Sequence, residues 1–246
     1  EKERHWVEDT WDRTDDLRTA GPRALRTHVG ATASLRRSLY DESGGMDTSL
    51  RLGEDIDLGY RLAEHGAVFV ADRAARSWHL GRTHQQRRQD EVNDYNAPFL
   101  ADRVPDLQPQ RRRGRLYSVP YVEVVLDTRG EPHGAVQAVV DSVLASSLAD
   151  LSVTLLGDWS AISEERTPPL DDPQLSARLV RASYAGEPRV VLSESGVEEL
   201  APRAQFRMVL GSAGWAPTSE TLAMLVMHIE RTHHGLRQVA LPDGTR

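Results

Sequence analysis

The chain has 246 residues, of which 39% are hydrophobic and 27% charged, so it can build one large domain or two modest ones and is not compositionally disordered. Its formal net charge of -7 argues against a dedicated nucleic-acid-binding protein, whose surface would be basic. Because it contains no cysteine, disulfides, thiolate metal sites and cysteine nucleophiles are excluded. No apolar run approaches the ~18 residues that span a bilayer. The sequence therefore predicts a cytoplasmic protein without a transmembrane segment.

The beginning of the chain predicts short helices and turns. Residues 1–26 are polar with scattered apolar points, which suggests helical or loop material that needs a partner surface. Residues 28–40 are rich in small side chains and then become helical in character. A turn is expected at 41–45, where the paired glycines Gly44 and Gly45 supply backbone angles that other residues avoid.

A helix followed by a strand is predicted next. Apolar residues recur at helical spacing over 55–65, and Gly66 is suited to ending that helix. The run AVFVA at 67–71 predicts a short buried strand. An arginine-rich polar stretch follows, and it continues as a helix to about Asp102.

A boundary between two domains is predicted near residue 110. The run LQPQRRRGR at 107–115 combines proline, glycine and a charge cluster, which favours a solvated linker over a phosphate or lipid site. We therefore divide the chain into a first domain at 1–107, an arginine-rich linker at 108–116 and a second domain at 117–246.

The second domain has the pattern of a βαβ unit. A strand at 119–126, an amphipathic helix at 134–148 and a strand at 151–156 follow one another at the spacing of a parallel pair. Further elements are expected at 189–192, 206–210 and 221–232. The residues predicted to be buried in its core are Val124, Leu126, Val140, Val153 and Leu155.

The stretch from Val29 to Gly81 carries a series of motifs in a fixed order. It resembles the second, acceptor-side half of family 2 glycosyltransferases, which have the GT-A fold. The matching features are a small-residue turn with paired arginines (Gly30-Ala31-Thr32, Arg36-Arg37), a glycine turn (Gly44-Gly45-Met46-Asp47), a Gly-Glu-Asp step (Gly53-Glu54-Asp55), a helix (Asp57 to Leu62) and Trp78-His79. Any one of these would be weak, but the set in order is specific. The resemblance implies an α/β fold with a parallel-rich sheet and flanking helices.

The two acidic residues at the start of the predicted helix are the candidate catalytic pair. An inverting transferase needs a carboxylate to take the proton from an acceptor hydroxyl as it attacks the anomeric carbon. A helix N-terminus favours the ionised, proton-accepting form of Asp55. The alternative is that Glu54 and Asp55 only cap the helix. The resemblance implies that Asp55 is the base and that Glu54 binds the acceptor.

The resemblance also implies a divalent cation, Mn²⁺ or Mg²⁺, with His79 as one ligand. Imidazole is an acceptable ligand for Mn²⁺ beside oxygen donors, and a structural histidine is the alternative. Arg61 could bind a diphosphate or pair with Asp57 or Glu54. The remaining candidates for acceptor or phosphate binding are Gly30, Thr32, Arg37 and Trp78.

The donor-binding half of such an enzyme would precede Val29, so the first domain is expected to be incomplete. The second domain resembles the opening βαβ of another family 2 domain. Only Asp158 and Ser160 keep the nucleoside-side pattern there, and Trp159 departs from it. The residues 211–214 that follow the last predicted strand hold no carboxylate, which predicts a degenerate domain without a metal site.

These observations predict a protein that transfers a sugar from a nucleotide-sugar donor to a carbohydrate or cell-envelope acceptor. It would act in the cytoplasm or peripherally at the inner face of the membrane. The isolated chain is expected to transfer no sugar. One alternative is a non-catalytic pseudo-transferase module that binds a glycan or a partner protein, and another is a single permuted domain built from both halves. An Asp-x-Asp motif upstream of Asp55 would favour the enzyme.

Overall fold

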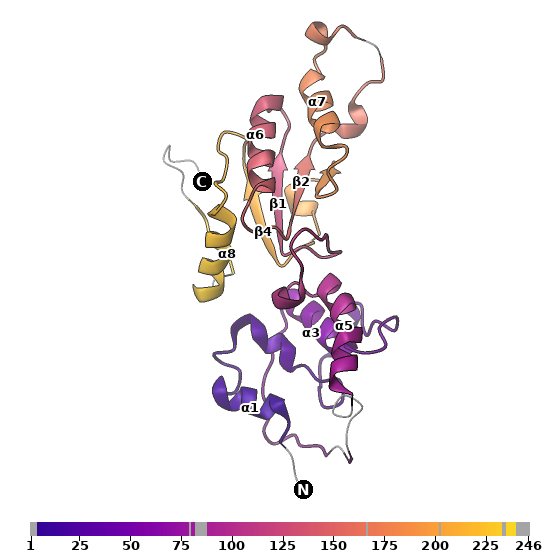
Figure 1. The fold of residues 1–246 in the computed structure, drawn as a ribbon, viewed down its shortest axis with the longest axis vertical. Helices are drawn as coiled ribbons and strands as arrows, with labels where there is room; N and C mark the ends of the chain where they lie inside the picture. The colour runs from indigo at the N-terminus through magenta and orange to yellow at the C-terminus, as the bar shows by residue number, and fades with distance from the viewer. Residues whose placement is uncertain are drawn as a thin grey trace. The chain divides into compact units, whose positions relative to one another are not determined.

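The structure, a computed structural model, describes residues 4–78, 80–81, 88–165, 167–201, 203–232 and 235–239. The chain divides into two compact units, Glu1–Arg111 and Arg112–Arg246 (indigo to magenta and magenta to yellow in Figure 1). The division falls inside the arginine-rich segment 108–116.

Among the described residues of the first unit, all the regular secondary-structure elements are helices, joined by turns and coil. Its elements are α1 (Trp6–Arg13), η1 (Gly21–Thr27), α2 (Arg37–Glu42), α3 (Glu54–Glu64), α5 (Gln89–Arg103) and η2 (Gln108–Gln110). The central helix is α3, which contacts both η1 and α5. Leu58 and Leu62 of α3 are buried together with Leu25 of η1 and Leu100 of α5, and this small apolar cluster holds the helices together.

Glycines set the start and the end of α3, as the sequence predicts for its end. Gly53 (φ +79) precedes the helix and Gly66 (φ +79) follows it, both in the left-handed region that glycine adopts without strain. A side chain at position 53 would also lie 2.9 Å from Leu100. The predicted glycine turn is present as well, since Gly44 and Gly45 have φ values of +82 and +65.

The predicted buried strand at 67–71 is wrong. The segment is coil, and Val68 and Val70 are 85% and 78% exposed. An alternating apolar segment becomes a strand only when a neighbouring strand accepts its backbone hydrogen bonds. The described part of this unit contains no strand that could pair with it. Trp78, expected at a strand end, also lies in coil and is 63% exposed.

The second unit is an α/β structure with a four-stranded, entirely parallel sheet in the order β3-β2-β1-β4. The strands are β1 (Val122–Asp127), β2 (Leu151–Leu156), β3 (Val190–Ser193) and β4 (Phe206–Leu210). The helices are α6 (His133–Leu144), α7 (Leu175–Tyr184) and α8 (Thr221–Thr232), with short 3-10 turns η3 (Trp159–Ala161), η4 (Pro169–Asp171) and η5 (Val197–Glu199). The predicted α/β class with a parallel sheet and flanking helices is confirmed. The assignment to GT-A stays a prediction.

One face of the sheet carries the apolar core. Val124 and Leu126 of β1, Val153 and Leu155 of β2, and Val140 of α6 are almost completely buried, as predicted. Side chains of α6, α7 and α8 belong to the same cluster, so these helices cover this face (Figure 1). Alternation along each strand therefore points the remaining side chains to the opposite face.

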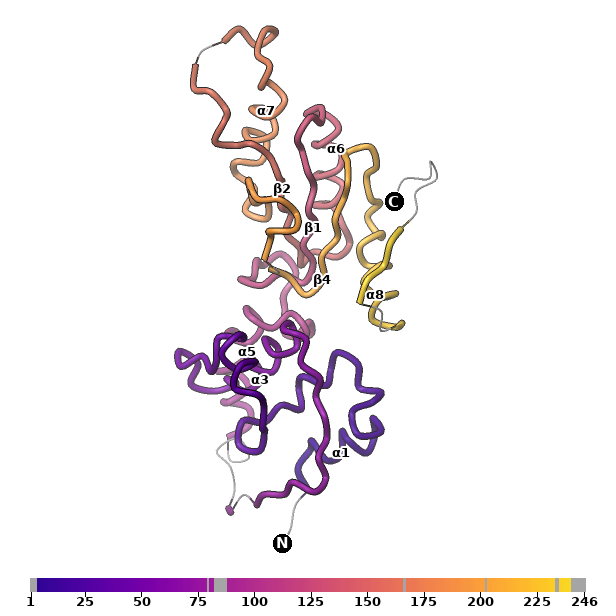
Figure 2. The backbone as a smooth tube through the Cα atoms, turned by 180° about the vertical axis from the view of Figure 1, so that it is seen from behind, coloured from indigo at the N-terminus to yellow at the C-terminus, as the bar shows by residue number. Residues whose placement is uncertain are grey.

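The opposite face carries a buried polar row that crosses three strands. Glu123 of β1 is 0% exposed, and its Oε1 accepts a hydrogen bond from the Thr154 hydroxyl of β2 at 2.7 Å. Its Oε2 accepts from Nε of Arg207 in β4 at 2.8 Å. Arg207 also donates to the carbonyls of Leu200 and Ala201, in the connection from β3 to β4. Within 194–201 and 203–205, the described residues of that connection, η5 is the helical element; the connection is seen from behind in Figure 2.

Candidate functional site

The candidate catalytic pair occupies the first turn of α3, as predicted. Glu54 and Asp55 are half-buried, and Asp55 accepts a hydrogen bond from the Ile56 amide at 2.9 Å. The N-cap residue is Gly53, which has no side chain that could form a capping hydrogen bond. The Glu54 side chain forms no hydrogen bond or ion pair with the described residues. Both carboxylates therefore lie at the positive end of the helix, and neither stands at the N-cap position itself.

The small-residue segment before Arg36 packs along the same face of α3. Asp55 and Gly59 are one helical turn apart, so both point to this face. A side-chain carbon added at Gly30 would lie 3.8 Å from Cβ of Asp55. One added at Gly59 would lie 2.7 Å from the carbonyl oxygen of Leu25 and 3.0 Å from Cβ of His28. The structure thus brings the predicted residues Gly30 and Asp55 together.

His28 is a candidate that the sequence analysis did not identify. It is 7% exposed, and its Nε2 has no hydrogen-bond partner among the described residues. Burial lowers the pKa of His28, while the Asp55 carboxylate acts in the opposite direction. The imidazole is therefore neutral at pH 7, with one ring nitrogen buried and unpaired near the candidate base. Its position two residues before Gly30 was the only sequence signal.

Two of the predicted phosphate-binding arginines pair with carboxylates of their own helices. Nε and Nη2 of Arg61 bond to Oδ2 of Asp57 at 3.0 and 2.8 Å, and Arg61 also donates to the Ser43 carbonyl. Arg37 donates to both carboxylate oxygens of Asp41 at 2.8 Å on the exposed surface of α2. Of the two roles considered for Arg61, the ion pair with Asp57 is the one that the structure contains.

The other predicted site residues are not gathered around Asp55 by any contact in the described structure. Thr32 is exposed, and its amide bonds to the Val29 carbonyl at 3.0 Å. Trp78 lies in exposed coil, and the predicted metal ligand His79 lies outside the described residues. Within the described ranges, no group of three or more His, Cys, Asp or Glu side chains could hold a metal ion.

In the second unit, arginine bridges the carboxyl ends of three strands. Arg129 bonds to Asp127, the last residue of β1, at 3.1 Å and to Asp158, which follows β2, at 3.0 Å. Its Nη2 also donates to the Glu194 carbonyl after β3 at 3.2 Å. Open parallel sheets usually bind ligands beyond this edge, where the strand order reverses. Here Asp158, the predicted nucleoside-side residue, is held by a side chain of the same chain.

Two neighbouring features complete this edge. Trp159, which departs from the family pattern, is buried, and its indole N–H lies 3.1 Å from the carbonyls of both Leu155 and Ser193. It packs so closely on Gly157 that an added side-chain carbon there would lie 2.7 Å from the ring. In the 211–214 loop after β4, the Ala213 amide donates to Glu131 at 3.1 Å. Trp159 thus has a structural role at the position where this chain departs from the family pattern.

A comparison with known protein families finds no family model that matches this chain, and a comparison with curated proteins finds no match. The resemblance to family 2 glycosyltransferases accordingly rests on the motif residues. Among the helices of the described ranges, none is long and apolar enough to cross a membrane.

Burial of a neutral His28 predicts a specific pH dependence of stability. The unfolded chain takes up a proton at this residue as the pH falls below about 6.5, whereas the folded chain resists doing so, which favours unfolding. We expect His28→Leu to reduce the stability lost between about pH 7 and pH 5. Urea unfolding at several pH values would measure this. His228→Leu, on the exposed surface of α8, serves as the control, and an unchanged pH slope in His28→Leu would contradict the prediction.

Close packing at Gly59 predicts that Gly59→Ala destabilises the first unit by about 1–3 kcal/mol, because the Leu25 carbonyl cannot move freely away. This would reverse the usual gain of up to about 1 kcal/mol when alanine replaces glycine in a helix. Gly134→Ala in α6 is the matched control, since an added carbon there meets nothing within 4 Å. Amide hydrogen exchange should report a lower free energy of unfolding for the first unit in Gly59→Ala and a higher one for the second unit in Gly134→Ala. Stabilisation by Gly59→Ala would contradict the packing.

Proposed function

We propose that this chain is the acceptor-side part of an inverting family 2 glycosyltransferase and that Asp55 is its general base. The observation that carries the proposal is the packing of Gly30 against Asp55 on one face of α3. This packing brings the Gly30-Ala31-Thr32 motif and the Gly53-Glu54-Asp55 motif together at the Asp55 side chain. Asp57, the neighbouring acid, is neutralised by Arg61 and is 4% exposed, which leaves Asp55 and Glu54 as the accessible acids of this turn.

The chemistry assigned to these residues is proton transfer and orientation. Asp55 would accept the proton of the acceptor hydroxyl as that oxygen bonds to the anomeric carbon and the nucleoside diphosphate departs. Glu54, without an internal partner in the described structure, would accept a hydrogen bond from a second hydroxyl of the acceptor. The carboxylate of Asp55 would face the acceptor from the positive end of α3.

His28 is proposed as a positioning residue for this step. Its Cβ would lie 3.0 Å from a side-chain carbon added at Gly59, one turn after Asp55, and its ring centroid lies 6.4 Å from that of Phe69. A neutral imidazole with a free Nε2 can donate or accept a hydrogen bond, depending on its tautomer. It would hold an enclosed water molecule near Asp55 without placing a second charge there.

The described residues do not themselves form a cation site, so no catalytic step is assigned to a metal on this chain. His79 remains the proposed ligand for Mn²⁺ or Mg²⁺, a role that needs further oxygen ligands. The second unit is proposed to be a non-catalytic, pseudo-transferase domain. The bridge made by Arg129 supports this, because it occupies Asp158, the carboxylate that would otherwise face a nucleoside.

A transfer assay on the full-length protein that contains this chain tests the proposal. The protein would be supplied with UDP- or GDP-sugars, Mn²⁺ and a panel of glycan acceptors, and the released nucleotide measured. Acceptor-stimulated release is the expected result. Glycan binding without any nucleotide release would instead support the binding-module alternative for the whole protein.

A further inference from the structure

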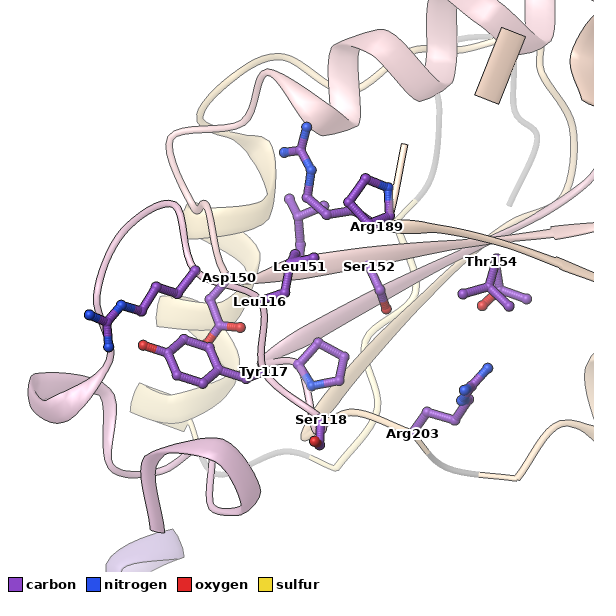
Figure 3. A pocket seen from close by; sticks show the side chains of 13 residues that line it. Leu116, Tyr117, Ser118, Asp150, Leu151, Ser152, Thr154, Arg189 and Arg203 are labelled. Atoms are coloured by element: carbon purple, nitrogen blue, oxygen red, sulfur yellow. The ribbon is translucent and has the colours of Figure 1, made fainter. Parts of the chain in front are cut away.

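The second unit contains a pocket of about 130 Å³ that the proposed function does not use. It lies at the amino ends of β2 and β3, on the sheet face opposite α6. Ser152 and Thr154 of β2 form its floor (Figure 3). One wall is the segment 115–120 that leads into β1, and Arg203, shortly before β4, contributes the facing wall.

The pocket exists because this face of the sheet has little cover. The connection from β3 to β4 contains only the three-residue turn η5, so no α-helix of the described chain lies in this crossover. Arg207 fixes the connection over β4 through the carbonyls of Leu200 and Ala201. The amino ends of β2 and β3 are left with a hollow larger than the ~30 Å³ that one water molecule takes in the liquid.

The pocket has a surplus of positive charge. Of its three arginines, Arg189 is neutralised, because its Nε and Nη2 both bond to Glu187 at 2.9 Å. The guanidinium groups of Arg115 and Arg203 form no hydrogen bond or ion pair with the residues that the structure describes. The acid of the pocket, Asp150, already accepts a hydrogen bond from the Tyr121 amide at 3.2 Å.

The floor adds a free hydrogen-bond donor. The Thr154 hydroxyl donates to Glu123, so its proton is already used. The Ser152 hydroxyl lies one pleat away on the same face, is half-buried and makes no hydrogen bond to the described residues. The lining of the pocket therefore includes two arginines and one hydroxyl whose side-chain donors make no hydrogen bond to the described residues. This donor set suits an anion with several acceptor oxygens.

We propose that this pocket binds the phosphate group of a small phosphorylated molecule. Guanidinium groups match phosphate through paired N–H donors, and they are less strongly hydrated than an ammonium group. At the carboxyl edge of the sheet, Arg129 is already paired with Asp127 and Asp158. Arg115 and Arg203, whose guanidinium groups have no partner among the described residues, line the pocket at the amino edge. The proposal is independent of the glycosyltransferase assignment, since none of its residues belongs to the Asp55 site.

Calorimetric titration of the whole chain with inorganic phosphate, uridine monophosphate and uridine tests the proposal. Phosphate and the nucleotide should bind, and uridine alone should not. Arg115→Gln and Arg203→Gln should each weaken binding about tenfold or more, as expected for loss of a charge-assisted hydrogen bond. Ser152→Ala should weaken it less and leaves the charge unchanged. Arg231→Gln in α8 removes the same charge outside the pocket and should have no effect.

Amide chemical shifts of the wild-type chain provide a second measurement that does not depend on variants folding. Phosphate should shift the amides of Ser152 and Thr154 and leave those of α8 unchanged. The proposal is overturned if phosphate at millimolar concentration neither binds nor shifts these amides. It is equally overturned if uridine binds as well as the nucleotide, or if Arg231→Gln weakens binding as much as Arg203→Gln.

Discussion

Asp55→Asn in the full-length protein is expected to lower turnover by at least the ~10²-fold that loss of a general base costs. Asparagine keeps the size of the side chain and can still accept the hydrogen bond that the Ile56 amide gives to Asp55. It cannot take a proton from an acceptor hydroxyl. Folding and donor binding should therefore survive, while kcat falls. Initial rates of nucleotide release at saturating donor and acceptor would measure the effect.

The control for this variant is Asp41→Asn, which removes a carboxylate from the surface of α2. That residue pairs only with exposed Arg37 among the contacts described for it, so a change there should leave turnover near the wild-type value. Near-normal turnover of Asp55→Asn, with an acceptor that the wild-type protein uses, would remove Asp55 from the role of base. Equal losses in both variants would point to a change in folding.

The second unit could be predicted well from the sequence because its signals are local. Each strand is a short apolar run, and the helix between β1 and β2 has apolar residues on one side, so the strand-helix-strand pattern is visible within about 40 residues. The parallel pairing of β1 with β2 and the burial of Val124 and Val153 follow from that pattern. Helix α7 was missed, because the polar segment before β3 has only Val180 and Tyr184 buried.

The first unit shows where local signals fail. The run at 67–71 has the composition of a strand, but a strand depends on a neighbour that the local sequence does not specify. Helix α3 was predicted correctly, since its apolar spacing and its terminal glycine are local features. The exposure of Val68 and Val70 is thus a property of the surroundings and not of the segment itself.

The candidate site was predictable only in part, for the same physical reason. The position of Asp55 at a helix start follows from the sequence. The pairing of Arg61 with Asp57 is an i,i+4 contact that helical spacing already allows. His28 was missed because its burial depends on packing against Gly59 of α3, which is distant in the sequence. The contacts of Arg129 could not be predicted either, because they depend on the ends of three strands that come together only in the folded sheet.

Glu123→Ala is expected to destabilise the second unit by about 3 kcal/mol or more, as when one partner of a buried ion pair is removed. Glu123 is fully buried in the central strand β1, where it accepts hydrogen bonds from Thr154 and Arg207. Alanine would leave the Arg207 guanidinium, whose side chain is 23% exposed, without its carboxylate. It would also leave the Thr154 hydroxyl without an acceptor and open a cavity beneath the connection from β3 to β4.

The test is amide hydrogen exchange in β1 and β2, which reports the free energy of unfolding of the second unit separately from that of the first. Glu198→Ala, on the exposed turn η5, is the control and should change it by less than about 0.5 kcal/mol. The double variant Glu123→Leu with Arg207→Met should recover much of the lost stability. Two apolar side chains bury no charge that needs a partner. A loss below about 1 kcal/mol in Glu123→Ala would show that water reaches Arg207, and that the polar row does not hold the connection onto the sheet.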